Sequence, residues 1–404
     1  MRRGTRRSSV LAAAALTAVV AASCTSGAAR SSPSTTTGST TTTAPAGSTT
    51  TVATPTVGSQ VKVAALSGLS VIDQTHAYAL IGPRYYSTTG AVGVAATVDG
   101  GAHWTAVATQ QTLQPLSYES GLVFATAQRG WTWQAGPSSC CTDTSAPTTR
   151  PLMATGDGGH TWKAVPGITG VEQVLSLGQS VWVVTQPGSA GAATAPVVLW
   201  TSSDGGATWA RSTAATPPVR SLVRVTASTA YGLGQTGIVT TTDGGTSWTA
   251  VGTMPCSSAR LDLTTLTHLS AGGVGDLWLA CVSQPETSLQ AKQLYRSSDG
   301  GAHWHLAASV PLGGVAPGGS TPVVGQISGR GFVQQLTALS PEQAVLALDR
   351  GGLFGTTDGG VDWTAVGPAA QAAVVSVTSA GIGLALLDGA PWHTTDGVHW
   401  APVG

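Results

Sequence analysis

A short phrase that ends in tryptophan occurs seven times along this chain, and it constrains the fold more than any other feature. One copy reads TTDGGTSW, at Thr241–Trp248, and the last copy, Thr394–Trp400, has one glycine fewer. The seven acidic positions are Asp99, Asp157, Asp204, Asp243, Asp299, Asp358 and Asp396, and the seven aromatic positions are Trp104, Trp162, Trp209, Trp248, Trp304, Trp363 and Trp400. Repetition at intervals of 38 to 59 residues is typical of chains built from copies of one small unit.

The residues before each phrase alternate between apolar and polar side chains in short runs, which is typical of β-strands. Around Asp243 the runs cover Ser221–Val225, Ala230–Leu233, Gly237–Thr240 and Trp248–Val251. None of these runs has a helical period, and turn residues separate them. We therefore predict that each unit is a sheet of four short antiparallel strands.

The phrase itself is predicted to be the turn between the third and fourth strands of each unit. A short carboxylate can accept hydrogen bonds from backbone amides two or three residues later and so close the turn. The paired glycines tolerate the positive φ angles that a tight hairpin requires. The tryptophan is then expected on the outgoing strand, where its ring fills the wedge against the neighbouring unit.

The phrase resembles the Asp-box, or bacterial neuraminidase repeat, whose pattern is S/T-x-D-x-G-x-T-W. Asp-boxes recur in β-propellers, among them sialidases, sortilin-type receptors and the photosystem II assembly-factor family. The resemblance implies an all-β fold, namely a seven-bladed β-propeller of four-stranded antiparallel blades with Asp-box turns, over residues 59–404. Units such as Gly130-Trp131 followed by a box are similar to those of the seven-bladed assembly-factor-like group. Because only four residues follow Trp400, we expect blade seven to own its outer strand, without a strand-exchange clasp.

The N-terminal residues have the features of a targeting segment. A basic leader precedes the apolar run Val10–Val20, and small residues then lead to Cys24, which is similar to a bacterial lipobox. We expect residues 1–23 to be a lipoprotein signal peptide and Cys24 to be lipidated; the alternative is an ordinary secretory signal. Residues 24–58 are rich in Ser and Thr and predict a disordered tether. The protein is thus expected outside the cytoplasm, lipid-anchored to the outer face of the bacterial cytoplasmic membrane or to the cell surface.

Composition excludes several kinds of partner. The leader holds four of the 18 basic residues and none of the 18 acidic ones, so the mature chain has a formal net charge of −4. This balance does not favour binding to nucleic acid. The sequence has no phosphate-cradling loop and no Cys/His spacing suited to zinc, so we expect no cofactor and no metal. A monomer is expected.

In a propeller whose chain enters each blade at the central channel, the turns between strands one and two and between strands three and four share one face. All Asp-boxes therefore lie on that face. The sizeable insertions are predicted on the opposite face: 84–90, 134–150, 186–196 and 284–292 between second and third strands, and 108–120 and 309–330 between blades. Variable loops on a rigid scaffold commonly form binding sites, although they can also be inert filler.

Several polar residues stand at or just before the starts of the innermost strands, on this opposite face. Arg220, Arg260 and Arg330 come from consecutive blades, so their guanidinium groups could converge on a carboxylate, sulfate or phosphate; alternatively they are solvated rim charges. Glu119 and Glu172 come from blades two and three, and Tyr85, Tyr86 and Tyr118 could add stacking surface.

Four cysteines follow Cys24. Cys256 and Cys281 flank the first two strands of blade five, and an oxidising compartment favours a disulfide between them. Cys140 and Cys141 lie in a blade-two loop, where a vicinal disulfide and two free thiols are both open.

Sialidases share Asp-boxes and an arginine triad, so a glycosidase has to be considered. Glycoside hydrolysis generally needs two carboxylates, or in sialidases a tyrosine nucleophile with acidic helpers. Seven of the 18 acids lie in the turns, and only Glu119 and Glu172 form a defensible pair at the channel mouth. We therefore predict a non-catalytic lipoprotein that binds a protein or glycan partner. The alternative is a sialidase-like or other glycoside hydrolase or glycan-binding propeller that uses the residues named above.

Overall fold

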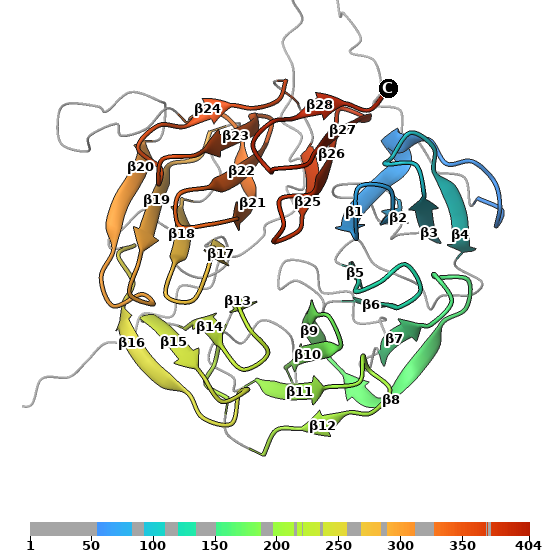
Figure 1. Cartoon of the computed structure of the whole chain (residues 1–404), viewed down its shortest axis with the longest axis horizontal. Helices are drawn as coiled ribbons and strands as arrows, with labels where there is room; N and C mark the ends of the chain where they lie inside the picture. Colours follow the sequence, from blue (N-terminus) through green and yellow to red (C-terminus); the bar gives the residue numbers. More distant parts are fainter. Residues whose placement is uncertain are drawn as a thin grey trace, which may run out of the picture. The chain divides into compact units, whose positions relative to one another are not determined.

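Seven four-stranded antiparallel sheets stand around a ring in the computed structural model of this chain, which is thus a seven-bladed β-propeller (Figure 1). The predicted fold class is confirmed. The structure describes residues 55–82, 93–109, 120–134, 151–186, 197–213, 216–219, 221–234, 237–256, 268–283, 289–311, 327–368, 370 and 373–404. The predicted signal peptide, Cys24 and most of the tether lie outside these ranges. Within them, no helix is long and apolar enough to cross a membrane.

Each blade consists of four strands that follow one another in the chain and pair in that order. A short 3-10 helix, η1 (Val63–Ala65), precedes the first blade. Blades one to four contain β1 (Leu66–Val71), β2 (Ala77–Ile81), β3 (Gly93–Thr97), β4 (Thr105–Thr109), β5 (Ser120–Phe124), β6 (Gly130–Gln134), β7 (Pro151–Thr155), β8 (Lys163–Thr169), β9 (Val171–Leu177), β10 (Ser180–Thr185), β11 (Val198–Ser202), β12 (Ala210–Arg211), β13 (Ser221–Arg224), β14 (Ala230–Leu233), β15 (Gly237–Thr241) and β16 (Thr249–Thr253). Blades five to seven contain β17 (His268–Ala271), β18 (Leu277–Val282), β19 (Lys292–Ser297), β20 (His305–Val310), β21 (Phe332–Ala338), β22 (Ala344–Asp349), β23 (Gly352–Thr356), β24 (Thr364–Ala365), β25 (Ala373–Val377), β26 (Gly383–Leu387), β27 (Ala390–Thr394) and β28 (Ala401–Pro402).

The core lies between blades. The second strands are covered on both sides, and they read as continuous apolar runs, such as LWLACV in β18 and AVLALD in β22, with every residue buried. Trp278 of blade five meets Trp363 of blade six edge to face, with ring centroids 5.9 Å apart. Outer strands such as β24 and β28 are two residues long and exposed, so they contribute little to the core.

The Asp-box forms the predicted turn between strands three and four. Oδ1 of Asp243 accepts hydrogen bonds from Thr241 Oγ1 at 2.8 Å and from the amide of Ser247 at 2.9 Å, and Oδ2 accepts one from Ser247 Oγ at 2.6 Å. In the boxes with two left-handed glycines the donor amide lies four residues after the aspartate, not two or three as predicted. In the shortened box of blade seven the amides of Val398 and His399, two and three residues after Asp396, donate to it as predicted. The Ser247 hydroxyl, its amide and Thr241 together lower the pKa of Asp243 to about 2.

The second glycine of each box joins its blade to the preceding one. Gly245 has a φ of +86°, and a methyl group there would overlap Leu199 Cδ2 of blade three. The corresponding glycine approaches a side chain of the preceding blade in every box, for example Gly301 beside Ile238. Only glycine combines the left-handed conformation with this close approach. In the shortened box of blade seven the lone glycine, Gly397, keeps this second role.

Blade seven owns its outer strand, as expected, because β28 pairs with β27. The ring closes through the innermost strands, where the amide of Val71 in β1 donates to Ser376 Oγ in β25 at 3.2 Å. The N-terminal residues add an edge to blade one: Gln60 pairs with Thr105, outside β4.

Hydrogen bonds fix the two faces of the ring. In blades one to six, the first glycine of the box donates its amide to the turn between strands one and two of its own blade; the Gly244 amide, for example, lies 2.9 Å from Ser228 O. We call the face that carries both sets of turns the Asp-box face. The opposite face, where the first and third strands begin, is called the loop-bearing face. The strand bounds place the predicted insertions after β2, β4, β6, β10, β18 and β20, each of which ends on the loop-bearing face.

Candidate functional site

Of the eight predicted binding residues, two lie in the part of the chain that the structure describes. Glu172 is exposed near the start of β9 in blade three, and Arg330 is exposed just before β21 in blade six. Both are therefore on the loop-bearing face, but blades four and five separate them around the ring (Figure 1), so they do not form one site. The other six lie outside the described residues: Glu119, Arg220, Arg260, Tyr85, Tyr86 and Tyr118. The predicted convergence of three arginines stays a prediction.

A second arginine that the sequence did not single out lies beside Arg330. Arg350 occupies the turn between β22 and β23, and a Cβ on its neighbour Gly351 would lie 3.0 Å from the carbonyl oxygen of Arg330. Arg350 has a φ of 61°, which is uncommon for a residue other than glycine. Its guanidinium lies 5.6 Å from the ring centroid of Phe332, and half of the side chain is exposed. The two arginines thus form a cationic patch on blade six.

The patch includes an acidic group, Asp349. Its carboxylate lies 3.9 Å from Nε of Arg350. Burial raises the pKa of Asp349, and the negative charge of Asp388 raises it further, although the positive charge of Arg350 opposes both effects. Arg330 forms no ion pair with any carboxylate among the described residues. Its guanidinium donors are therefore available to an anionic group of a ligand.

A buried polar network lies directly beneath Arg330, at the joint between blades five and six. Lys292 is fully buried, and its Nζ donates hydrogen bonds to Gln290 O at 2.9 Å and to Gly329 O at 3.3 Å. Gln290 is buried as well; it accepts a hydrogen bond from the amide of Val333 at 2.9 Å and donates one from Nε2 to Ser283 O at 3.1 Å. Burial lowers the pKa of Lys292 to about 7.

His268, at the start of β17, completes this network. Burial lowers the pKa of its imidazole, while a hydrogen bond to the backbone of Val333 opposes that shift. The histidine is therefore held mainly neutral at neutral pH. Two ionisable side chains with displaced pKa values thus meet the same backbone segment, Gly329–Val333, at the loop-bearing end of blades five and six.

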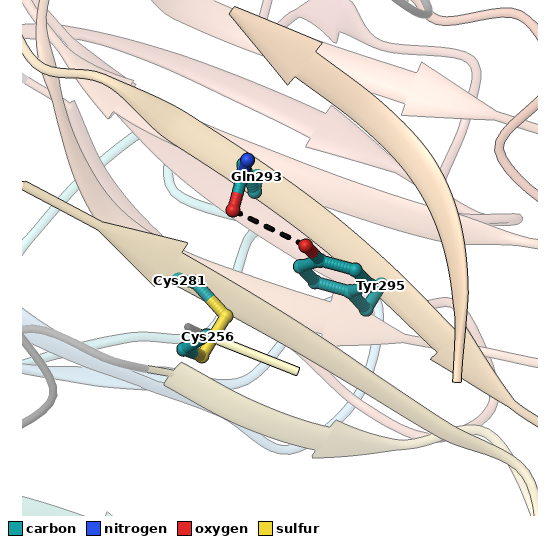
Figure 2. The surroundings of a disulfide bond; sticks show 4 residues. All are labelled: Cys256, Cys281, Gln293 and Tyr295. Carbon is teal, nitrogen blue, oxygen red and sulfur yellow. Dashed lines mark hydrogen bonds between the residues drawn. A yellow bond between two sulfur atoms is a disulfide. The ribbon is translucent and has the colours of Figure 1, made fainter. Parts of the chain in front are cut away.

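A disulfide reinforces blade five at the same end. Cys256, which follows β16, is bonded to Cys281 of β18, as predicted (Figure 2). Both cysteines are buried, and Tyr295 and Gln293 of the adjacent strand β19 lie beside them, joined by a hydrogen bond of 3.2 Å. The bond ties the chain that leaves blade four to the second strand of blade five. Cys140 and Cys141 lie outside the described residues.

The Asp-box face has cavities, but its carboxylates are used by the fold. Cavities of about 360 to 430 Å³ lie at the joints between blades seven and one, one and two, five and six, and six and seven. Asp99 and Asp157 line the second of these, and each closes its own box. Hydrogen bonds, from the His103 amide to Asp99 and from Thr161 to Asp157, lower both pKa values to about 2. Neither carboxyl can act as a general acid near neutral pH, because both stay ionised.

Two arginines on the Asp-box face also bind within the fold. Arg129 of blade two donates to the carbonyl oxygens of Asp204 and Gly205 in blade three, each at 2.9 Å. Arg224 of blade four donates to Ser180 O at 3.0 Å and stacks on Trp182 of blade three at 4.4 Å. These side chains hold blades together. Among the described residues there is also no group of three or more His, Cys, Asp or Glu side chains that could hold a metal ion.

Comparison with known proteins identifies the fold. No protein-family model matches this sequence, and no curated protein matches it. The structure of YCF48 bound to D1 peptide is similar, with a TM-score of 0.50 and 17% identity over 84% of this chain and 97% of that one. YCF48 from Cyanidioschyzon merolae gives a TM-score of 0.49 and 15% identity over 84% and 98% of the two chains. An ancestral GH74 enzyme gives a TM-score of 0.55 and 13% identity over 86% of this chain and 47% of the enzyme. At these identities the similarity to the YCF48–peptide complex and to the GH74 enzyme shows a shared propeller fold and nothing more.

Proposed function

We propose that this protein is a non-catalytic binding propeller that holds a protein or glycan partner on its loop-bearing face. The observation that carries the proposal is the different use of charged groups on the two faces. On the Asp-box face, carboxylates such as Asp243 and guanidinium groups such as Arg224 bond within the fold. On the loop-bearing face, the backbone segments that carry Arg330 and Arg350 lie close together, and both side chains are exposed.

The chemistry of this patch favours an anionic group on the partner. Guanidinium groups bind carboxylates, sulfates and phosphates through paired hydrogen bonds, and two adjacent arginines can hold one such group from two sides. The apolar ring of Phe332, beneath Arg350, keeps that side chain extended over it. A peptide carboxylate and an acidic sugar are therefore the ligand groups that fit best.

The similar proteins are compatible with either class of partner. The solved YCF48 complex contains a D1 peptide, and the GH74 protein is described as an enzyme. For the present chain, we propose a scaffold or recognition role. A lipid at Cys24 and a tether over residues 24–58 would hold this propeller at the outer face of the membrane or at the cell surface.

Site-specific photo-crosslinking of the full lipidated chain in its host cells tests the proposal. A photoreactive amino acid replaces Arg330 on the loop-bearing face or, as a matched control, Lys163, which is exposed at the Asp-box end of β8. We expect a discrete crosslinked product from position 330 and none from position 163. Crosslinking from position 163 alone would contradict the assignment of the face.

The glycosidase alternative has its own test. Purified protein is assayed against fluorogenic sialosides and other glycosides, and no turnover is expected. Turnover that Glu172→Gln abolishes would overturn the non-catalytic proposal, because Glu172 is the described member of the predicted carboxylate pair.

A further inference from the structure

We propose that Lys292 is a proton-sensitive anchor that positions the Gly329–Arg330 segment on the loop-bearing face. The inference rests on the proposed function in one respect, namely that Arg330 belongs to the binding surface. The positioning itself is a property of the propeller alone.

The geometry gives Lys292 this role. The carbonyl oxygen of Gly329 accepts two hydrogen bonds, from Lys292 Nζ at 3.3 Å and from the amide of Gln290 at 3.2 Å. The adjacent residue, Arg330, forms a single bridge with Leu289. The backbone before β21 is therefore attached to blade five by a few bonds, and one of them comes from a group that can gain or lose a proton.

The surroundings of the Lys292 side chain satisfy its neutral amine form better than its ammonium form. Val282 and Val310, which pair with Lys292 in β18 and β20, belong to a buried apolar cluster that also contains Leu294 and Val333. A neutral amine has two N–H donors, which match the two carbonyl acceptors. An ammonium group has three, so the two carbonyl oxygens leave one N–H without an acceptor among the described contacts, and the buried charge lacks solvation.

Few other charged groups lie at this joint in the described part of the chain. From β17, His268 meets Val333, and from the segment before β21, Arg330 itself is nearby. At the end of β22, Asp349 pairs with Phe332 and forms an ion pair with Arg350. Asp388, which follows β26, acts electrostatically on Asp349. β18, β19 and β20 contribute no carboxylate here, and Lys292 has no ion pair with a described residue. Burial therefore dominates, and it lowers the pKa of Lys292 to about 7. The anchor is expected to change state near neutral pH.

The sequence makes a direct test practical, because the chain has only three lysines: Lys62, Lys163 and Lys292. The full mature chain is labelled with ¹³Cε-lysine, and the three signals are followed by NMR from pH 5 to pH 11. We expect one of the three signals to titrate near 7. Lys292→Met must remove the signal with the low midpoint. The absence of any signal with a midpoint near 7 would overturn the proposal.

Amide exchange tests the positioning. In wild-type protein, exchange at Gly329–Val333, corrected for the intrinsic effect of pH, is expected to change several-fold across a midpoint near 7. Lys292→Met should abolish this transition, whereas His268→Phe and the exposed control Lys163→Met should leave it in place. A transition that persists in Lys292→Met, or that disappears in His268→Phe alone, would overturn the assignment to Lys292. Because no partner is present, these outcomes are independent of whether Arg330 binds one.

Discussion

Two adjacent glycines of one box give a matched test of the claim that the Asp-box turn joins neighbouring blades. Gly244 and Gly245 are both left-handed, with φ angles of +77° and +86°. A Cβ on Gly244 would meet nothing within 4 Å, whereas a Cβ on Gly245 would overlap Leu199 of the preceding blade. Replacing each glycine by alanine therefore separates backbone strain from crowding at the joint.

The expected magnitudes follow from these two environments. A left-handed alanine costs about 1–2 kcal/mol, and this applies to both variants. Crowding in a packed site adds about 1–3 kcal/mol to Gly245→Ala alone. The gain from a stiffer unfolded chain is the same for both and cancels in the comparison. Gly245→Ala should thus lower the free energy of unfolding by about 1–3 kcal/mol more than Gly244→Ala.

Urea unfolding of the mature chain, followed by tryptophan fluorescence, measures this difference. A double-mutant cycle then identifies the neighbour that is responsible. Leu199→Ala removes the overlapping methyl groups, so Gly245→Ala should cost about as much as Gly244→Ala in that background. Equal effects of the two glycine substitutions in the wild-type background would refute the reasoning, as would an excess cost that persists with Leu199→Ala.

Three further predictions concern the disulfide and the titrating groups. Replacing both Cys256 and Cys281 by alanine should lower the free energy of unfolding by about 3–4 kcal/mol in urea, since the bond closes a loop with a sequence separation of 25. The pKa of Asp157 is lowered to about 2 in the folded state, so its stabilising effect is present above pH 4 and is lost as the pH falls toward 2. Thr161→Val removes a hydrogen bond that lowers this pKa, so the stabilising effect should be lost at a higher pH in acid unfolding monitored by circular dichroism. For Lys292 the pKa falls from 10.5 in the unfolded chain to about 7, so the unfolded chain holds the extra proton between these values and stability rises with pH by about 1.4 kcal/mol per unit. In urea unfolding, the free energy of unfolding should rise between pH 7.5 and pH 9.5 by about 2–3 kcal/mol more in the wild-type protein than in Lys292→Met. An equal rise in the two proteins would contradict this prediction.

The fold could be predicted because its determinants are local. Each box is closed by contacts within eight consecutive residues, so seven copies of the phrase were enough to count seven blades. The strands around Asp243 were placed to within two residues, because alternation and turn residues delimit them. The pairing of Cys256 with Cys281 was likewise predictable, since the repeat places both at the same end of blade five.

The binding surface was less predictable because it depends on contacts between blades. Lys292 is buried at the joint between blades five and six, where Gly329, about forty residues later in the chain, accepts its hydrogen bond. From the sequence alone, Lys292 is expected at the end of a loop. Alternate side chains of a β-strand face the same side, so Lys292 lies on the same side of β19 as the buried Leu294. This alternation could have revealed that Lys292 is buried. Arg350 could not have been singled out, because its place beside Arg330 results from the pairing of Phe332 with Asp349.

Hydrogen exchange of the mature chain, alone and with the crosslinked partner bound, tests the central claim most directly. Binding is expected to slow exchange at the loop-bearing ends of the blades, most clearly at Ser328–Phe332, and to leave the seven Asp-box turns unchanged. Slower exchange at those turns, with none at the loop-bearing ends, would contradict it.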